Sequence, residues 1–141
     1  MNPLQRALLF GFIRVHTALF RLTNGRIGGR MGTQRILLLT TTGRASGRRR
    51  TVPLTYFEDG ERLVIIASAG GAPRDPAWWR NLQLRPEAHV QVGRERRAVR
   101  ARIASPEERA RLWPRVKREN PAYAEYEKRT SREIPVVLLA L

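Results

Sequence analysis

Apolar residues recur along this chain with two different periods, and the period predicts where helices and strands lie. Over residues 3–22 the apolar side chains recur at spacings of three and four, which predicts an amphipathic helix at the N-terminus. Shorter apolar runs bounded by turn residues predict strands. These strands are predicted at residues 35–42, 49–58, 63–68, 88–92, 95–104 and 134–140. Further helices are predicted to start where a capping residue precedes a proline, at Asp75-Pro76, Ser105-Pro106 and Asn120-Pro121.

The order of these elements indicates the fold class. One helix, five strands interrupted by a second helix, two more helices and a last strand make an α+β arrangement. Asp59-Gly60 predicts a tight hairpin, so the first three strands are expected to form an antiparallel meander. Pro53 lies in the second of these strands and predicts an edge position or a bulge. Mostly antiparallel pairing is expected to curl the sheet into a small barrel. We assign residues 1–33 to the helix and a glycine-rich connector, and residues 34–141 to the barrel domain.

Composition excludes several kinds of chemistry. With 141 residues, of which 42% are hydrophobic, the chain is long enough for one domain with its own core. Cysteine is absent, which excludes disulfides, thiolate metal sites and a cysteine nucleophile. The only histidines, His16 and His89, leave little for a zinc site or a serine–histidine–aspartate triad, so no metal is expected.

The chain is strongly basic, with 27 lysines and arginines against 12 acidic residues and a formal net charge of +15. All the basic residues except Lys117 and Lys128 are arginine. One interpretation is a bias of the coding sequence, and another is that some guanidinium groups bind phosphate or carboxylate. A basic nucleic-acid-binding domain is a further alternative. Aromatic residues make up only 7% of the chain and we recognise no binding module, so no specific nucleic-acid partner is predicted.

The N-terminal helix leaves two interpretations open. It carries arginines beside a broad apolar surface, so it either packs on the domain or on a second copy in a homodimer, or lies on a membrane surface. No uncharged apolar run reaches the length of a transmembrane helix, and Arg14 and His16 interrupt the stretch that a signal peptide would need. We expect a cytoplasmic protein, either free or peripheral on the inner face of the cell membrane.

Two segments combine glycines with groups that bind anions. Residues 40–53 place hydroxyls, glycines and arginines between two strands, but the lysine and the spacing of a Walker A loop are missing. Residues 67–81 run from a Gly-Gly loop into the start of a helix that carries Trp78 and Trp79. Two such turns at the ends of neighbouring strands suggest a flat, anionic cofactor along a sheet edge. The alternative is a basic hairpin tip and two tryptophans that pack in the core.

A third candidate is the pair Tyr123 and Tyr126, which share one face of a helix and either line a pocket or pack in the core. The chain offers few histidines and aspartates and no cysteine. Such a composition fits hydride transfer from a bound cofactor better than hydrolysis, because the cofactor then carries the chemistry and the protein orients it.

These segments resemble one protein family. The residues LLLTTTGRASGRRRTVPL, IIASAGGAPRDPAWWRNL and YAEYEKRTSREIPVVLLAL, in this order, are similar to the deazaflavin-dependent nitroreductases, which are small proteins that use coenzyme F420. The resemblance covers about residues 35–141 and extends to the F420H2-dependent quinone reductases of that family. It implies a six-stranded, mostly antiparallel split β-barrel with flanking helices.

The resemblance also implies an oxidoreductase in which reduced coenzyme F420 passes a hydride to an electron-poor acceptor, a quinone or adventitiously a nitroaromatic compound. Tyr123 would lie beside the deazaflavin, Tyr126 nearer the substrate, and Ser68 with them. The implied cofactor-binding residues are Arg44, Ala45, Ser46, Arg50, Thr51, Val52, Pro53, Leu54, Thr55, Ala67, Ser68, Ala69, Ala77, Trp78, Trp79, Arg80, Asn81 and Tyr123.

The sequence departs from the family pattern at a few of these positions. Ala45 and Ala69 stand where a longer polar side chain is common, and each loses a contact to the cofactor's phosphate or tail. Arg48, Arg49 or Arg74 could substitute for the lost contacts. Thr55 and Asn120 stand where tyrosines occur on the substrate side, which disfavours nitroimidazole activation. The remaining alternatives are a split barrel that binds FMN and one that carries a cofactor without turnover.

Overall fold

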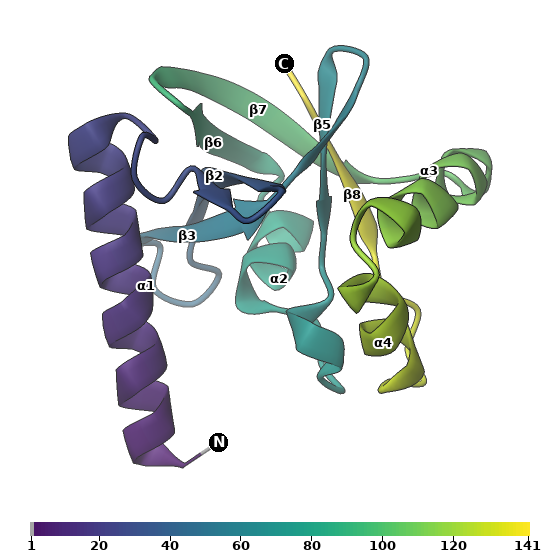
Figure 1. Cartoon of the computed structure of the whole chain (residues 1–141), viewed down its shortest axis with the longest axis horizontal. Helices are drawn as coiled ribbons and strands as arrows, with labels where there is room; N and C mark the ends of the chain where they lie inside the picture. The colour runs from purple at the N-terminus through teal and green to yellow at the C-terminus, as the bar shows by residue number, and fades with distance from the viewer. Residues whose placement is uncertain (1) are drawn as a thin grey trace.

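The structure, a computed structural model, describes residues 2–141, and in it one curled antiparallel sheet is flanked by four helices (Figure 1). The helices are α1 (Pro3–Thr23), α2 (Ala77–Leu84), α3 (Pro106–Glu119) and α4 (Ala122–Lys128), with a short 3-10 turn, η1 (Ala69–Gly71). The strands are β1 (Arg30–Met31), β2 (Gln34–Thr42), β3 (Arg49–Thr55), β4 (Phe57–Asp59), β5 (Arg62–Ile66), β6 (Glu87–Val92), β7 (Glu95–Ile103) and β8 (Val136–Ala140). The predicted α+β class is confirmed.

The sheet curls into a half-barrel. Its order is β1-β2-β6-β7-β8-β5-β4, with β3 paired to β2, and every pairing is antiparallel. Among the described residues β3 pairs only with β2, so the edge position predicted from Pro53 is confirmed. The described residues form eight strands rather than the six that the resemblance implies. One of the two additional strands is the two-residue β1, which pairs with the start of β2.

The other additional strand arises because the predicted strand 49–58 is broken at Tyr56. Its first part, β3, pairs with β2, whereas its last part, β4, pairs with β5 on the far side of the half-barrel. At the break, the Tyr56 N–H donates to the Arg35 carbonyl oxygen at 3.0 Å, and the Tyr56 side chain is buried. The antiparallel pairings of the predicted meander are therefore correct, but its middle strand is divided at Tyr56 into β3 and β4.

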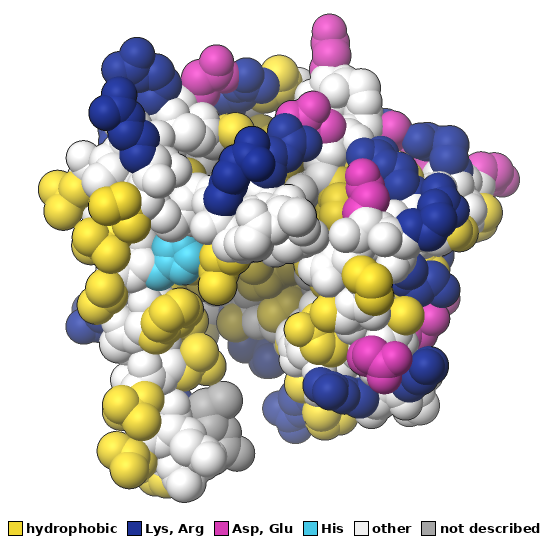
Figure 2. All heavy atoms as spheres, viewed as in Figure 1, with side chains coloured by type: hydrophobic (Ala, Val, Ile, Leu, Met, Phe, Trp, Pro, Cys, Tyr) yellow, Lys and Arg dark blue, Asp and Glu magenta, His cyan; other side chains and the backbone are white. Residues whose placement is uncertain are grey.

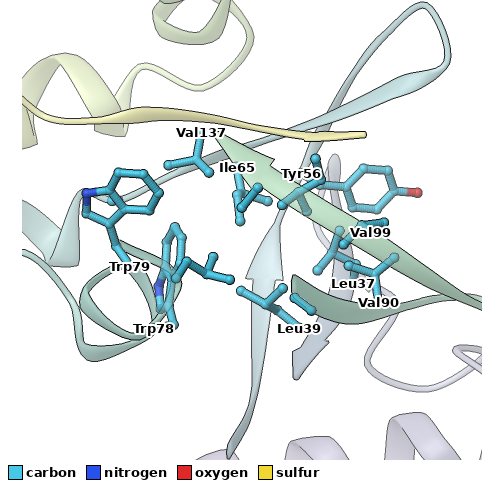
Figure 3. Packing of buried hydrophobic residues seen from close by; sticks show 14 residues of the cluster. Leu37, Leu39, Tyr56, Ile65, Trp78, Trp79, Val90, Val99 and Val137 are labelled. Carbon is cyan, nitrogen blue, oxygen red and sulfur yellow. The ribbon is translucent and has the colours of Figure 1, made fainter. Parts of the chain in front are cut away.

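The half-barrel encloses a core that α2 closes at one end. Figure 3 shows Trp78 and Trp79 pointing from α2 into the interior, toward Leu39, Ile65 and Val137. Both tryptophans are buried, as the alternative of two tryptophans that pack in the core predicts. Burial of two such large side chains anchors α2 firmly at this end of the sheet.

A second apolar cluster lies between β5 and β8 on one side and α3 and α4 on the other. Ser105 starts α3 with a reciprocal capping box, in which its hydroxyl accepts from the Glu108 N–H and the Glu108 carboxylate accepts from the Ser105 N–H. Trp113 of α3 and Tyr123 of α4 pack edge to face, with ring centroids 6.4 Å apart. This cluster holds α4 and its tyrosines against the sheet.

Helix α1 touches the rest of the chain along one face only. Its buried residues are His16, Thr17 and Phe20, and His16 Nε2 lies 2.7 Å from the Gly28 carbonyl oxygen. The helix runs along β3 and extends beyond the sheet toward its own N-terminus (Figure 1). Of the helices between residues 2 and 141, none is long and apolar enough to cross a membrane.

Candidate functional site

A cavity of about 290 Å³ opens between β3, the end of β5, η1, α2 and α4. Seven of the residues implied by the resemblance line it together: Leu54, Thr55, Ser68, Ala69, Trp78, Tyr123 and Tyr126. Its other lining residues are Ile66, Gly70, Pro76 and Asn120. The structure therefore brings together residues that lie as far apart in sequence as β3 and α4.

The loop between β5 and α2 forms one wall of the cavity. Ser68 has right-handed helical backbone angles, whereas Ala69 has a φ of 47°, in the left-handed region. A right-handed residue followed by a left-handed one turns successive backbone N–H groups to the same side, which makes a concave site for an anion. Gly71 lets this loop approach α4 closely, because a Cβ atom there would lie 2.7 Å from the Tyr126 carbonyl oxygen.

One arginine holds this loop in shape. The Arg132 guanidinium donates to the carbonyl oxygens of Ala72 (2.9 Å), Ala67 (3.2 Å) and Ser68 (2.7 Å). It also donates to the Asp75 carboxylate at 2.8 Å. The prediction that Asp75 caps α2 is wrong: the N-cap residue is Pro76, and no side chain caps the helix there. Arg132 is missing from the predicted site, although it lies in the REIPVV segment that carries the resemblance.

The opposite wall is aromatic. The rings of Tyr123 and Tyr126 meet at nearly right angles, with centroids 5.7 Å apart, and Phe57 packs on the other side of Tyr123. Burial raises the pKa of Tyr123 to about 12, and interaction with the Thr55 side chain offsets only part of that rise. The Tyr123 phenol therefore stays protonated at neutral pH. Tyr126 is less buried than Tyr123.

Two of the implied cofactor ligands bind each other. Asn81, which is buried on α2, accepts from both the backbone N–H (3.1 Å) and the guanidinium (3.0 Å) of Arg44. Its amide nitrogen donates to the Thr41 hydroxyl at 3.1 Å. Asn81 thereby ties the basic turn between β2 and β3 to α2. The neighbouring residues Ala45 and Ser46 are exposed at the tip of this turn.

Strand alternation separates the implied residues of β3 into two groups. Val52 and Leu54 pack against the interior core, and Arg50 lies on the same face of the strand by alternation. Thr51 and Pro53 lie on the opposite face, where the Thr51 hydroxyl accepts from Arg21 of α1 at 2.9 Å. Thr51 and Pro53 therefore do not line the cavity.

The remaining implied residues lie around α2 and the end of β5. Ala67 and Trp79 are buried in the core behind the cavity. Ala77 is exposed at the start of α2, and Arg80 is half-buried one turn later. Among residues 2–141, no cluster of acidic and histidine side chains could hold a metal ion.

Comparison with known proteins identifies the family. The family model for F420H(2)-dependent quinone reductases matches residues 12–140. An F420H(2)-dependent quinone reductase of Mycobacterium tuberculosis is 44% identical over 140 residues, which cover 96% of this chain and 94% of that protein. A solved F420-H2 dependent reductase is 39% identical with a TM-score of 0.67, over 74% of this chain and 92% of its own. A solved domain-swapped dimer is 36% identical with a TM-score of 0.70, over 87% of this chain and 93% of its own. This chain therefore belongs to the family of F420H(2)-dependent quinone reductases.

Proposed function

We propose that this protein transfers a hydride from reduced coenzyme F420 to a quinone, and that the reaction takes place in the cavity between β3, η1 and α4. The chemistry follows from family membership, because the relatives are quinone reductases that depend on F420H(2). One observation supports the proposed place: two phenols and a left-handed backbone turn line a single cavity. A phenol can give a proton and such a turn can hold an anion.

The residues present fit a flat cofactor with an anionic side chain. Leu54, Ile66 and Trp78 offer apolar walls for a ring system. The turn at Ser68-Ala69 suits the phosphodiester of the coenzyme. The basic turn before β3 is tied to α2 through Arg44 and Asn81, and its exposed guanidinium groups suit the polyglutamate tail.

The reduced deazaflavin, when bound, supplies the hydride. A quinone that accepts a hydride also needs one proton on an oxygen atom. We assign that donation to Tyr126 or to solvent at the open side of the cavity, because Tyr126 is the less buried phenol. Tyr123 stays protonated, since burial raises its pKa to about 12, and it serves to orient the ring system beside it. Ser68 lines the same cavity, and we assign it to the catalytic site together with Tyr123 and Tyr126.

The test is a parallel titration with coenzyme F420 and with FMN, followed by fluorescence, and then reduction of menadione by reduced coenzyme F420. We expect saturable binding of the deazaflavin, weak binding of FMN and turnover with menadione. Preference for FMN would make this a flavin-binding member of the fold. Binding without turnover would make it a cofactor carrier, and binding of neither would refute the proposal.

Arginine substitutions test the place of binding separately. Arg50→Ala removes an exposed guanidinium on the cavity side of β3, and we expect about 1.5–3 kcal/mol weaker cofactor binding if it makes a charged hydrogen bond. Arg118→Ala, on the outer surface of α3, is the charge-matched control. An equal effect of the two variants would show that only net charge attracts the cofactor, and the assigned anion site would be wrong.

We also propose that α1 lies on an anionic membrane surface, from which lipid-soluble quinones would reach the cavity. In support, one apolar stripe of α1 is largely exposed (Figure 2), and the helix carries three arginines, Arg6, Arg14 and Arg21, but no acidic residue. The stripe consists of Leu4, Leu8, Phe12, Val15, Leu19 and Leu22.

The variant Leu8→Ser/Val15→Ser/Leu22→Ser should lose binding to phosphatidylglycerol vesicles, measured by co-sedimentation. The alternative for the same stripe is a homodimer, and the 36% identical relative is a domain-swapped dimer. Light scattering decides between them. A variant that turns from dimer to monomer while vesicle binding stays unchanged would assign the stripe to a second copy.

A further inference from the structure

A second groove lies on the outer face of the half-barrel, beneath α1. Its volume is about 410 Å³, and it is lined by side chains of α1, β2, β3, β6 and β7. The pairing register explains why these side chains meet. Thr51 of β3 is opposite Thr40 of β2, which is opposite His89 of β6, so the three form one row across the sheet. Neighbouring strands lie about 4.8 Å apart, so the row spans about 10 Å.

This groove is separated from the cavity by the sheet itself. The residues that alternate with the row, Leu39, Val52 and Val90, point to the interior core. Thr40, Thr51 and His89 therefore face away from the side on which we place the reacting rings. The proposed function makes no use of this face.

Three guanidinium groups surround the row. Arg49 precedes Thr51 by two residues on the same face of β3, Arg96 of β7 is opposite Gln91 of β6, and Arg21 reaches over from α1. No acidic side chain lines the groove, and none of the three arginines forms an ion pair with a described acidic residue. Two neighbouring arginines of β7 differ in this respect, because Arg97 pairs with Glu95 and Arg100 pairs with Glu87.

Hydrogen bonds orient the groups toward one another. Arg21 Nη2 donates to the Thr51 hydroxyl at 2.9 Å, and the Thr40 and Thr51 hydroxyl oxygens lie 2.8 Å apart. Arg49 Nη2 lies 2.9 Å from His89 Nδ1. Because a guanidinium can only donate, Nδ1 must be the unprotonated nitrogen, and the His89 proton is then on Nε2. The groove thus offers guanidinium, hydroxyl and imidazole donors.

We propose that this groove binds a terminal phosphate group of an organic ligand, either a soluble phosphate monoester or the phosphate monoester headgroup of a lipid. The donors come from three arginines, two threonines and one histidine, and they outnumber what the two oxygens of a carboxylate can accept. A phosphate carries close to two negative charges and has three acceptor oxygens, so it matches the set of donors better. The site would be independent of the reaction in the cavity.

The experiment uses the fact that the chain has only two histidines. The full-length protein is titrated with inorganic pyrophosphate at constant ionic strength, and the ring signals of His89 and His16 are followed by NMR. His16 is a buried residue of α1 whose ring contacts the Gly28 carbonyl oxygen, and it serves as an internal control. We expect a saturable shift of the His89 signals while those of His16 stay in place. No shift of His89, or an equal shift of both, would overturn the proposal.

Charge-matched variants then test whether the groove is specific. Arg49→Gln and Arg96→Gln should each weaken pyrophosphate binding at least tenfold, whereas Arg118→Gln, on the outer surface of α3, should change it less than about threefold. If all three variants weaken binding equally, the protein attracts anions only through its net charge and there is no site.

Vesicles distinguish the two sources of phosphate. If the ligand is the phosphate monoester headgroup of a lipid, Arg49→Gln should also lower co-sedimentation with vesicles that contain phosphatidic acid, and pyrophosphate should compete with them. If the ligand is a soluble phosphate ester, Arg49→Gln should lose pyrophosphate binding and keep the vesicle binding of the native protein.

Discussion

Arg132 offers the sharpest test of how the candidate site is held together. Its guanidinium makes four hydrogen bonds, three to backbone carbonyl oxygens of the loop between β5 and α2 and one to Asp75. The substitution Arg132→Gln keeps much of the side chain's length. It removes the positive charge and the planar fork of N–H donors that the guanidinium presents. It leaves three carbonyl groups and one carboxylate to find water or other partners.

The size of the effect follows from these contacts. A hydrogen bond that involves a charged group contributes about 1.5–3 kcal/mol, but the four bonds share one side chain and are not additive. The Arg132 side chain is 16% exposed, so water can replace part of what is lost. We therefore expect the free energy of unfolding to fall by about 3 kcal/mol. For a domain of this size that corresponds to a Tm lower by roughly 10 °C.

Urea unfolding followed by tryptophan fluorescence measures this change, and titration with coenzyme F420 measures its consequence for the site. Arg132→Lys retains the charge but cannot reproduce the fork, so it should lose most of the same stability. Arg74→Gln removes a charge from an exposed position in the same loop and is the matched control. It should unfold within about 0.5 kcal/mol of the native protein.

Two results would refute this reasoning. If Arg132→Gln and Arg74→Gln lose the same small amount of stability, the four hydrogen bonds do not hold the loop. If Arg132→Gln is destabilised but binds the cofactor as tightly as the native protein, the loop does not contribute to the site. The second result would leave the fold argument intact and move the anion site elsewhere.

Three further predictions concern separate features. Ala69→Gly should raise the free energy of unfolding by about 1 kcal/mol in urea, because Ala69 has a φ of 47° and glycine adopts that region without strain. Tyr126→Phe should lower the turnover of menadione at least tenfold while the Kd for coenzyme F420 stays within about twofold; the reverse pattern would put this phenol on the cofactor side. Hydrogen bonds from Arg111 and then Arg62 lower the pKa of Asp59 from 3.8 to about 2. That contribution to stability is present above about pH 4 and is lost as the pH falls toward 2, so acid unfolding should be less steep for Asp59→Asn.

The sequence by itself determined the local elements of this protein. The capping box at Ser105 and Glu108, the hairpin at Asp59-Gly60 and the edge strand at Pro53 all depend on residues within a few positions of each other. Hydrophobic periodicity, helix capping and turn formation all depend on residues that are close in sequence. They therefore predict the local elements without knowledge of the rest of the chain. The family also followed from the order of short segments, and with it the expectation of the split barrel and the cofactor.

Only the tertiary structure decided which of these residues share a site. Arg132 bonds to Ala72, 60 residues away, and no local pattern marks such a partner. Asp75 is a second example. Its position before a proline suggests a helix cap, but its carboxylate accepts a hydrogen bond from Arg132 instead. The register across β3, β2 and β6 likewise decided that Thr51 faces α1 while Val52 faces the core. Contacts of this kind depend on the curl of the sheet and on the break at Tyr56, because the geometry of the closed fold, rather than the neighbouring residues, brings the groups together.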